Sequence, residues 1–266
     1  MKTVIITGSA RGFGYEMAKE FRKNNYNVVL SDLKEDSLKA AKSELEKIEG
    51  SGEILTCECD VSKNEDLEKL AKAAVEKFKT FDIWINNAGV NQPMLPLWEL
   101  SQDHINRLID IDLKGAINGS LVALREMIKN HSGAIYNVEG YGSNDAHMLG
   151  LNMYGTSKRA VTHFTDSLAL ECKEKETGVI VGKISPGIMI TKFTTHSMGE
   201  DKIDLPEKTK KVYNILGDTP DVIAKFMVEK MITNTKNNVR LSWLTNGKAF
   251  VRFLTAGFNK RNFFEE

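Results

Sequence analysis

The 266-residue sequence predicts an α/β fold, in which a parallel sheet carries helices on both faces. Short apolar runs alternate with longer amphipathic stretches along most of the chain, which is the pattern of repeated β-α units. The apolar runs are also too uniformly apolar for strands with one wet face, so both faces of each strand should be buried. No linker or shift in composition divides the chain, and we expect residues 1–266 to form a single domain.

The expected strands and helices follow one another in a regular order. Strands are predicted at residues 3–7, 27–32, 53–61, 81–89, 133–138, 178–185 and 239–244. Helices are predicted at residues 12–25, 34–49, 64–78, 102–129, 152–175 and 221–232. The stretch 188–218 has little periodicity and is expected to form a lid, because long irregular segments in compact domains are usually functional. Residues 245–266 form an aromatic and basic C-terminal extension.

The composition argues against several classes of protein. Basic and acidic residues are equal in number, 36 of each, so no bulk charge attracts the chain to nucleic acid. The N-terminal apolar run is too short for a signal peptide, and no run approaches the roughly 18 residues of a membrane span. Three cysteines build no disulfide framework, and Cys57 and Cys59 should share one strand face and pack in the core. We therefore expect a cytoplasmic protein with no metal site, no integral membrane segment and no nucleic-acid partner.

Three glycines follow the first strand and indicate a phosphate site. Gly8, Gly12 and Gly14 lie at the junction with the first helix, in the sequence TGSARGFG. Glycines allow a tight turn and a close approach of the backbone to a pyrophosphate, whose negative charge the helix N-terminus favours. The three-residue gap between the first two glycines differs from the usual G-x-G-x-x-G, and a plain strand-to-helix turn is the alternative.

Asp32 ends the second strand, about 20 residues after the glycine turn, where an acidic residue can recognise a ribose. Its carboxylate can accept hydrogen bonds from the adenosine ribose and would repel a 2′-phosphate, which favours NAD over NADP. Arg11 argues the other way, because its guanidinium could pair with a 2′-phosphate. Asp32 could instead be a solvated loop residue. NAD is the expected cofactor, and NADP is the less favoured choice.

Five motifs in a fixed order carry a resemblance to a known family. They are TGSARGFG (7–14), CDV with Asp60, NNAG (86–89), YGTSK (154–158) and PGIMIT (186–191). This series resembles the short-chain dehydrogenase/reductase family as far as about residue 192. From the fifth strand through PGIMIT the chain is most similar to a subgroup that includes the chlorophyll b reductases, which carry D-G-x-G-S where this chain has EGYGS. The resemblance implies a doubly wound Rossmann sheet with about seven parallel strands.

The resemblance also implies which residues contact the cofactor. Asp60 should lie beside the adenine, and Asn87 and Gly89 near the adenosine. Ile188 and Thr191 should lie near the nicotinamide amide and the phosphates. The full set of expected cofactor-binding residues is Gly8, Ser9, Arg11, Gly12, Phe13, Gly14, Asp32, Leu33, Asp60, Val61, Asn87, Ala88, Gly89, Tyr154, Lys158, Pro186, Gly187, Ile188 and Thr191.

Tyr154 and Lys158 lie four positions apart in a predicted helix, so both side chains should point to one face. A lysine cation beside a phenol favours the phenolate and is expected to lower the tyrosine pKa toward the working pH. The resemblance implies that Tyr154 exchanges a proton with the substrate oxygen while a hydride moves between nicotinamide and substrate, and that Lys158 also holds the ribose. The alternative is a tyrosine-lysine pair that only packs.

Asp112 occupies a position where the family usually has an asparagine, in a pattern like N-L-x-G that reads IDLKG here. In the family this asparagine helps to hold a water that links the lysine to solvent. An aspartate could accept from that water and pair with the Lys158 charge, and we include Asp112 in the candidate catalytic set. Alternatively, Asp112 only caps or packs.

The serine expected at the end of the fifth strand is missing. Glu139 and Gly140 stand there, and neither offers a neutral hydroxyl that would polarise a carbonyl oxygen. A charged Glu139 would even oppose negative charge on that oxygen. Ser143 follows in a loop whose glycines permit unusual conformations, and we expect it to supply the donor. It could instead sit in a polar turn, with Tyr141 and Asn144 as the other donors.

The loops expected around the site are rich in apolar residues, which suits an adaptable apolar pocket. These residues are Met148, Leu149, Leu151, Met153, Met189, Phe193 and Met198, and His147 and His196 could contact an acidic group. The expected substrate is a bulky hydrophobic alcohol or ketone such as a hydroxysteroid or bile acid, or a tetrapyrrole as the subgroup suggests. Alternatively, the apolar residues only pack the lid onto the domain.

Two functions remain open. The favoured one is an NAD(H)-dependent oxidoreductase that interconverts a secondary alcohol and a ketone, or an aldehyde, with Tyr154 as proton donor and acceptor. The alternative is a catalytically silent dinucleotide-binding regulator, which only Asp112 and Gly140 support. The resemblance implies a homodimer or homotetramer formed through the helices at 102–129 and 152–175. The C-terminal extension could cover the substrate cleft, pack in the oligomer or lie on a membrane surface.

Overall fold

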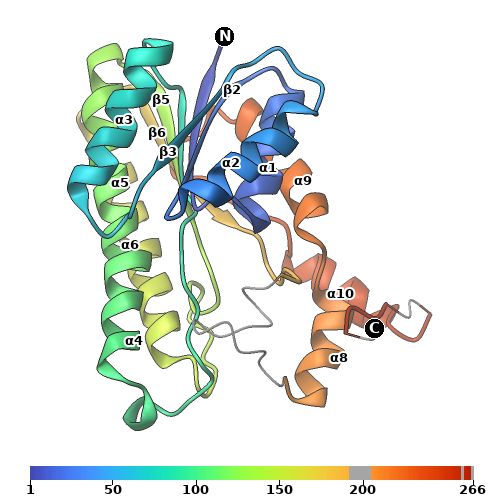
Figure 1. Ribbon diagram of the computed structural model, residues 1–266. Helices are drawn as coiled ribbons and strands as arrows, with labels where there is room; N and C mark the ends of the chain where they lie inside the picture. The colour runs from blue at the N-terminus through green and yellow to red at the C-terminus, as the bar shows by residue number, and fades with distance from the viewer. Residues whose placement is uncertain (192–204, 259–260, 265–266) are drawn as a thin grey trace.

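The computed structural model describes residues 1–191, 205–258 and 261–264, and these contain a seven-stranded parallel sheet with helices on both faces (Figure 1). The strand order is β3-β2-β1-β4-β5-β6-β7. The strands are β1 Thr3–Thr7, β2 Asn27–Asp32, β3 Ile54–Glu58, β4 Ile83–Asn86, β5 Gly133–Val138, β6 Val179–Ser185 and β7 Arg240–Ser242. The predicted Rossmann-type fold is therefore confirmed. The order reverses between β1 and β4, and the crevice at such a switch point is where open α/β sheets bind ligands.

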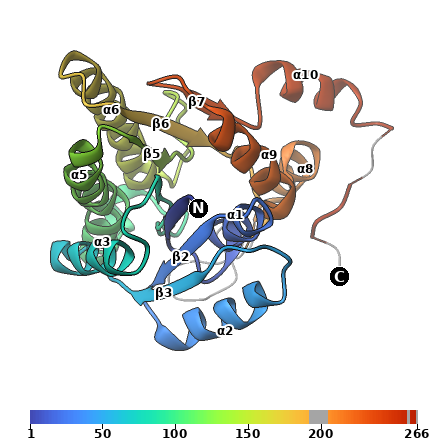
Figure 2. The same cartoon turned by 90° about the horizontal axis from the view of Figure 1, so that it is seen from above.

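The helices form a layer on each face of the sheet (Figure 2). They are α1 Gly12–Lys23, α2 Glu35–Glu46, α3 Asn64–Phe78, α4 Gln102–Arg107, α5 Gly115–Met127, α6 Asn152–Glu174, α8 Glu207–Leu216, α9 Pro220–Thr233 and α10 Asn246–Leu254. Helices α1, α2 and α9 cover one face, while α3, α5 and α6 cover the other. Among the described residues, none of these helices combines the length and apolar character needed to cross a membrane.

The first strand explains why its sequence is apolar at every position. Val4 and Ile6 join the core beneath α1 and α9, whereas Ile5 points to the opposite core beneath α3 and α5. Successive side chains of a strand face opposite sides, so a central strand with helices on both faces needs apolar residues throughout. The uniformly apolar runs in the sequence thus indicate a sheet that is covered by helices on both faces.

Two predicted segments differ from the structure. The helix expected at 102–129 is divided, because a π-helical turn at Leu108–Lys114 separates α4 from α5. Turns of this kind are frequent at functional sites, and this one carries Asp112. The stretch 188–218 is less irregular than its sequence suggested, since residues 207–216 form α8. Residues 192–204, with the predicted pocket residues Phe193, His196 and Met198, lie outside the described residues.

Candidate active site

The glycine turn after β1 is closed tightly against the NNAG segment. Gly8 has a φ of +63°, and a β-carbon there would lie 2.8 Å from the Ala88 Cα. A side chain at Gly14 would collide with the Gly8 carbonyl and lie 2.6 Å from the Asn87 Nδ2. Gly12, with a φ of +61°, faces open space at the N-terminus of α1. This cradle, with unshielded backbone beside a helix N-terminus, fits the pyrophosphate of a dinucleotide.

Several of the predicted cofactor residues hold the turn in place through their side chains. The Ser9 hydroxyl is buried, donates to the Ile6 carbonyl at 2.7 Å and accepts from the Ser31 N–H at 2.9 Å. The Asn87 amide donates to the Thr7 and Gly8 carbonyls, both at 2.9 Å. These contacts link β1 to its two neighbouring strands. Phe13 packs in the core beneath α1.

Asp32 ends β2 next to this turn, and Asp60 follows β3. Asp32 accepts hydrogen bonds from the Ala10 N–H at 3.1 Å and from the Leu33 N–H at 2.9 Å, and its side chain is only partly buried. Asp60 accepts from the Ser62 hydroxyl at 2.7 Å. Val61 is buried behind it. Arg11 is exposed at the start of α1, so both a carboxylate and a guanidinium flank the turn.

Tyr154, Lys158 and Asp112 come together at the carboxyl end of the sheet. The Lys158 Nζ lies 3.1 Å from an Asp112 oxygen and 5.7 Å from the centre of the Tyr154 ring. The other Asp112 oxygen accepts from the Val90 N–H at 2.7 Å. All three side chains are buried, and the shared helix face predicted for Tyr154 and Lys158 is present in α6. Asp112 therefore pairs with Lys158 directly, as one of the two sequence interpretations expected.

The pKa of Tyr154 differs from the expectation. Burial raises the Tyr154 pKa well above its ordinary value, and the negative charges of Asp112 and ionised Tyr213 act in the same direction. The lowering expected from Lys158 is not seen, because burial dominates the Tyr154 pKa and the Asp112 carboxylate beside Lys158 raises it further. Burial also raises the pKa of Asp112, although the Lys158 charge opposes that shift. Tyr154 is accordingly a neutral phenol across the neutral pH range.

Gly140 stands where the family serine was expected, and Tyr154 fills the space of the missing side chain. A β-carbon at Gly140 would collide with the Tyr154 hydroxyl and would lie 3.0 Å from the Lys158 Cγ. The absence of a side chain at this position therefore lets the tyrosine hydroxyl approach the backbone of the loop after β5.

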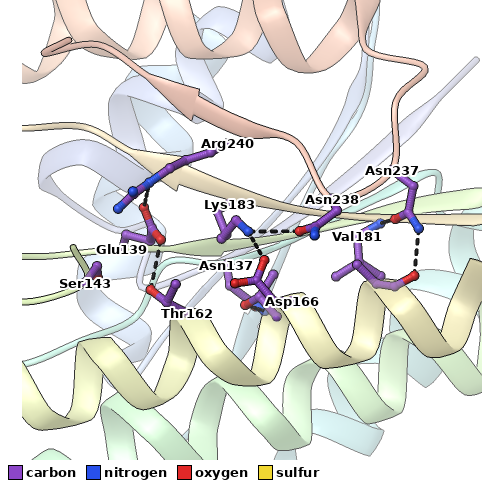
Figure 3. A network of polar contacts seen from close by, with 12 residues as sticks. Asn137, Glu139, Ser143, Thr162, Asp166, Val181, Lys183, Asn237, Asn238 and Arg240 are labelled. Carbon is purple, nitrogen blue, oxygen red and sulfur yellow. Dashed lines mark hydrogen bonds and ion pairs between the residues drawn. The ribbon is translucent and has the colours of Figure 1, made fainter. Parts of the chain in front are cut away.

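Glu139 is turned away from the tyrosine. Its carboxylate is buried and accepts from the Arg240 Nε at 2.6 Å and from the Thr162 hydroxyl at 2.9 Å. Figure 3 shows Glu139 between Arg240 on β7 and Thr162 on α6. The Glu139 charge, which was expected to oppose an oxyanion on the substrate, is thus neutralised by Arg240. Arg240 could not be identified in advance, because it lies in a short strand without a motif.

The Ser143 hydroxyl is bonded to backbone groups on both sides. It accepts from the Gly140 N–H at 3.2 Å and donates to the Lys158 carbonyl at 3.3 Å, and the side chain is buried. It lies at the turn after β5, beside α6 (Figure 3). The alternative donor Tyr141 also has a partner, since its hydroxyl donates to the His147 carbonyl at 3.0 Å.

One buried residue near the tyrosine was not predicted. Gln92 accepts from the Tyr154 N–H at 2.7 Å and donates to the Gly150 carbonyl at 2.6 Å. It joins the loop after β4 to the first turn of α6. A polar residue shortly after NNAG was the available signal, but the sequence shows no partner for it.

The PGIMIT segment is paired with the far end of the predicted lid. The Asp218 N–H donates to the Ile188 carbonyl, and the Ile190 N–H donates to the Asp218 carbonyl, both at 3.1 Å. Gly187 has a φ of +74°, and a β-carbon there would lie 2.7 Å from the Leu244 Cβ. Pro186 is buried, and Thr191 is the last described residue before the gap.

The C-terminal extension is fastened to the same point. The Asp218 carboxylate accepts from the Trp243 indole at 2.6 Å and is ion-paired with Arg252 at 2.7 Å and Arg261 at 3.0 Å. Arg252 on α10 and Arg261 are therefore held against the base of the predicted lid. Sequence reasoning did not identify Asp218 as a shared partner of three residues.

Comparisons with known proteins show which family the chain is similar to. The model of the short chain dehydrogenase family matches residues 2–202. A chlorophyll(ide) b reductase from Oryza sativa subsp. japonica is 32% identical over 95% of this chain and 74% of its own length. A probable chlorophyll(ide) b reductase from Arabidopsis thaliana is 27% identical over the whole of this chain, which spans only 55% of that relative's length. Glucose 1-dehydrogenase 2 from Bacillus subtilis (strain 168) is 33% identical over 75% of this chain and 76% of its own length.

A solved structure shows the same fold. A 7α-hydroxysteroid dehydrogenase complexed with NADH and 7-oxo glycochenodeoxycholic acid superimposes with a TM-score of 0.79 at 23% identity. The match covers 92% of this chain and 93% of the other. With the family match over residues 2–202, these findings lead to one assignment: the chain belongs to the short-chain dehydrogenase family.

Proposed function

We propose that the protein is an NAD(H)-dependent carbonyl reductase that acts on an aldehyde or ketone of a bulky apolar substrate. The formyl group of a chlorophyllide b-like tetrapyrrole is the first candidate, and a hydroxysteroid or bile acid ketone is the second. One observation carries this order: the Arabidopsis thaliana reductase matches the whole chain, the C-terminal extension included, and the Oryza sativa reductase matches 95% of it, whereas the glucose 1-dehydrogenase matches 75%. The part of the chain around α8 and α10 is thus included in the match to the Arabidopsis thaliana reductase.

Tyr154 is the proton donor in this proposal. A bound nicotinamide nucleotide would supply the hydride. As the carbonyl carbon gains the hydride, its oxygen takes the proton of the Tyr154 hydroxyl, and an alcohol is formed. Burial keeps this phenol protonated, which is the form that reduction needs.

Lys158 and Asp112 are positioned to stabilise the tyrosine after it has lost its proton. The Lys158 ammonium lies above the Tyr154 ring and favours the phenolate electrostatically. Asp112 holds that ammonium at 3.1 Å and limits its movement. Solvent then returns the proton to Tyr154 before the next turnover. We retain Ser143 as a candidate donor to the substrate oxygen, for which its hydroxyl would have to leave the Lys158 carbonyl.

The preference for NAD rests on Asp32. Its carboxylate lies beside the glycine turn and is partly exposed, so it can accept from ribose hydroxyls and repel a 2′-phosphate. We expect Asp32→Ala to lower the ratio of kcat/KM with NADH to kcat/KM with NADPH by roughly tenfold or more. A wild-type protein that already prefers NADPH would contradict this assignment and would leave Arg11 as the discriminating residue.

The experiment that tests the proposal is a set of reductase assays with NADH and NADPH side by side. The substrates are chlorophyllide b, a 7-oxo bile acid and diacetyl, and the nucleotide absorbance and the alcohol product are both measured. Turnover of chlorophyllide b above the other two supports the proposal. Tight nucleotide binding without turnover of any carbonyl would contradict it and favour a silent regulator. A homodimer or homotetramer formed through α5 and α6, and a cytoplasmic location, stay predictions.

A further inference from the structure

The charged side of helix α10, formed by Lys248 and Arg252, packs against the rest of the protein. The Lys248 ammonium lies over the Trp243 ring, and Arg252 donates to the Leu216 carbonyl at 2.8 Å and pairs with Asp218. In a helix on the surface of a soluble domain, the apolar side normally faces the core and the charged side faces water. The orientation of α10 is the reverse.

The apolar side of α10 consequently points away from the protein. Phe250, Val251, Phe253 and Leu254 are each at least half exposed, and Phe258 just beyond the helix is 93% exposed. At 3.6 residues per turn, the four helix residues share an arc of roughly 160°. Figures 1 and 2 show α10 at the edge of the molecule, beside α8. A contiguous apolar face of this kind marks an interaction site.

The charge of this part of the chain indicates the nature of the partner. Residues 205–266 contain 11 basic and 6 acidic residues, so the remaining residues contain 25 basic and 30 acidic ones. The C-terminal region is therefore basic, although the whole chain has a net charge of zero. Around Asp218 alone, three cations gather, namely Lys248, Arg252 and Arg261. A symmetric contact between two copies through α10 would bring two such basic regions together, whereas an anionic surface would be attracted.

We propose that α10 docks the protein on an anionic lipid surface. The side chains of Phe250, Phe253 and Leu254 would enter the interface between headgroups and acyl chains, with the helix lying parallel to the membrane. The cations on the opposite side of α10 would remain above that plane, as in amphipathic helices that lie on membranes. The proposal does not depend on the reaction catalysed, although a surface contact of this kind would suit a substrate dissolved in lipid.

Vesicle flotation tests this docking. The full-length protein is mixed with vesicles of phosphatidylcholine alone or of phosphatidylcholine with phosphatidylglycerol, and the bound fraction is measured at low and high salt. We expect binding to the anionic vesicles that weakens with salt. Phe250→Ser combined with Leu254→Ser should reduce partitioning on the order of tenfold or more, because two large apolar side chains leave the interface. Both substitutions lie on an exposed helix face, so folding is preserved.

The matched control is Trp98→Ser, which removes another exposed aromatic residue, 84% accessible, from the turn Leu97–Glu99. Vesicle binding of this variant should equal that of the wild type. The proposal is overturned if the wild type does not float with anionic vesicles, or if the double variant floats equally well. It is also overturned if the double substitution converts a dimer into a monomer without any vesicle binding, since α10 would then contact a second copy.

Discussion

Different interactions stabilise the glycine turn after β1, the nucleotide end of the molecule, and the region around Tyr154 after β5, its catalytic end. Around β1 the positions are fixed by close backbone packing at Gly8 and Gly14 and by the uncharged side chains of Ser9 and Asn87. Around β5 and β6 they are fixed by ion pairs that each contain a buried carboxylate, namely Lys158–Asp112 and Glu139–Arg240. The first kind of order is visible in two short motifs, TGSARGFG and NNAG, although 80 positions separate Thr7 from Asn87. The second requires partners that belong to no motif, such as Arg240, which lies 101 positions from Glu139.

Tyr154→Phe has the largest expected effect, because it should abolish most of the turnover at the catalytic end and leave NADH affinity at the nucleotide end unchanged. Removal of one hydroxyl eliminates the proton donor, so kcat should fall by roughly 10²–10⁴-fold. The glycine turn is untouched, and the dissociation constant for NADH, measured by fluorescence titration, should change less than about threefold, which corresponds to well under 1 kcal/mol. Undiminished turnover would show that another group donates the proton.

Gly14→Ala tests the nucleotide end, and NADH affinity and kcat/KM are again the quantities measured. The new β-carbon would collide with the Gly8 carbonyl and approach the Asn87 amide, and overpacking of this kind costs about 1–3 kcal/mol. NADH affinity should therefore fall about tenfold or more, with kcat/KM falling in parallel. Gly247→Ala is the control, because nothing lies within 4 Å of a β-carbon there and the residue belongs to α10, outside the glycine turn. Equal losses in both variants would contradict the close packing at Gly14.

The same contrast explains how much could be predicted from the sequence. The alternation of strands and helices, the glycine turn and the Tyr154–Lys158 pair follow from local patterns, namely apolar periodicity and short motifs. The partner of Glu139 could not be found, because Arg240 belongs to no motif and lies 101 positions away in the chain. The orientation of Ser143 was likewise inaccessible, since the choice between substrate and the Lys158 carbonyl depends on how the loop packs on α6.

The π-helical turn at Leu108–Lys114 is a second feature that the sequence pattern did not predict. Its apolar spacing reads as one continuous helix, because a single π turn shifts the pattern by only one residue. The consequence is nevertheless functional, since this turn carries the Asp112 carboxylate that pairs with Lys158. Local patterns thus predicted the elements of the site, while the pairing of its charges required the three-dimensional arrangement.

Glu139→Gln should weaken the catalytic end without touching the nucleotide end. The amide has the size of the carboxylate but loses the charge that Arg240 and Thr162 contact, and the free energy of unfolding should fall by about 1–3 kcal/mol. Chemical denaturation measures this change, and NADH affinity serves as the unaffected reference.

A matched control for Glu139→Gln is Glu126→Gln, which removes the carboxylate of an exposed pair with Lys129. Exposed pairs contribute roughly 0–1 kcal/mol, so this variant should lie close to the wild type. If the two variants lost equal stability, burial would not be what makes the Glu139 pair matter.

Lys248→Met has the smallest expected effect and extends the comparison to the C-terminal extension. Loss of solvation and the neighbouring cations Arg252 and Arg261 lower the Lys248 pKa to about 8, against 10.5 ordinarily. Between these two pH values the unfolded chain holds a proton that the folded protein has released, so this lysine makes stability rise with pH. Below pH 8 the penalty of the buried charge is complete. Lys248→Met removes it and should raise Tm on the order of 2 °C at pH 7, with the difference shrinking at pH 10. A Tm difference that is the same at both pH values would show that the three cations around Asp218 do not repel one another.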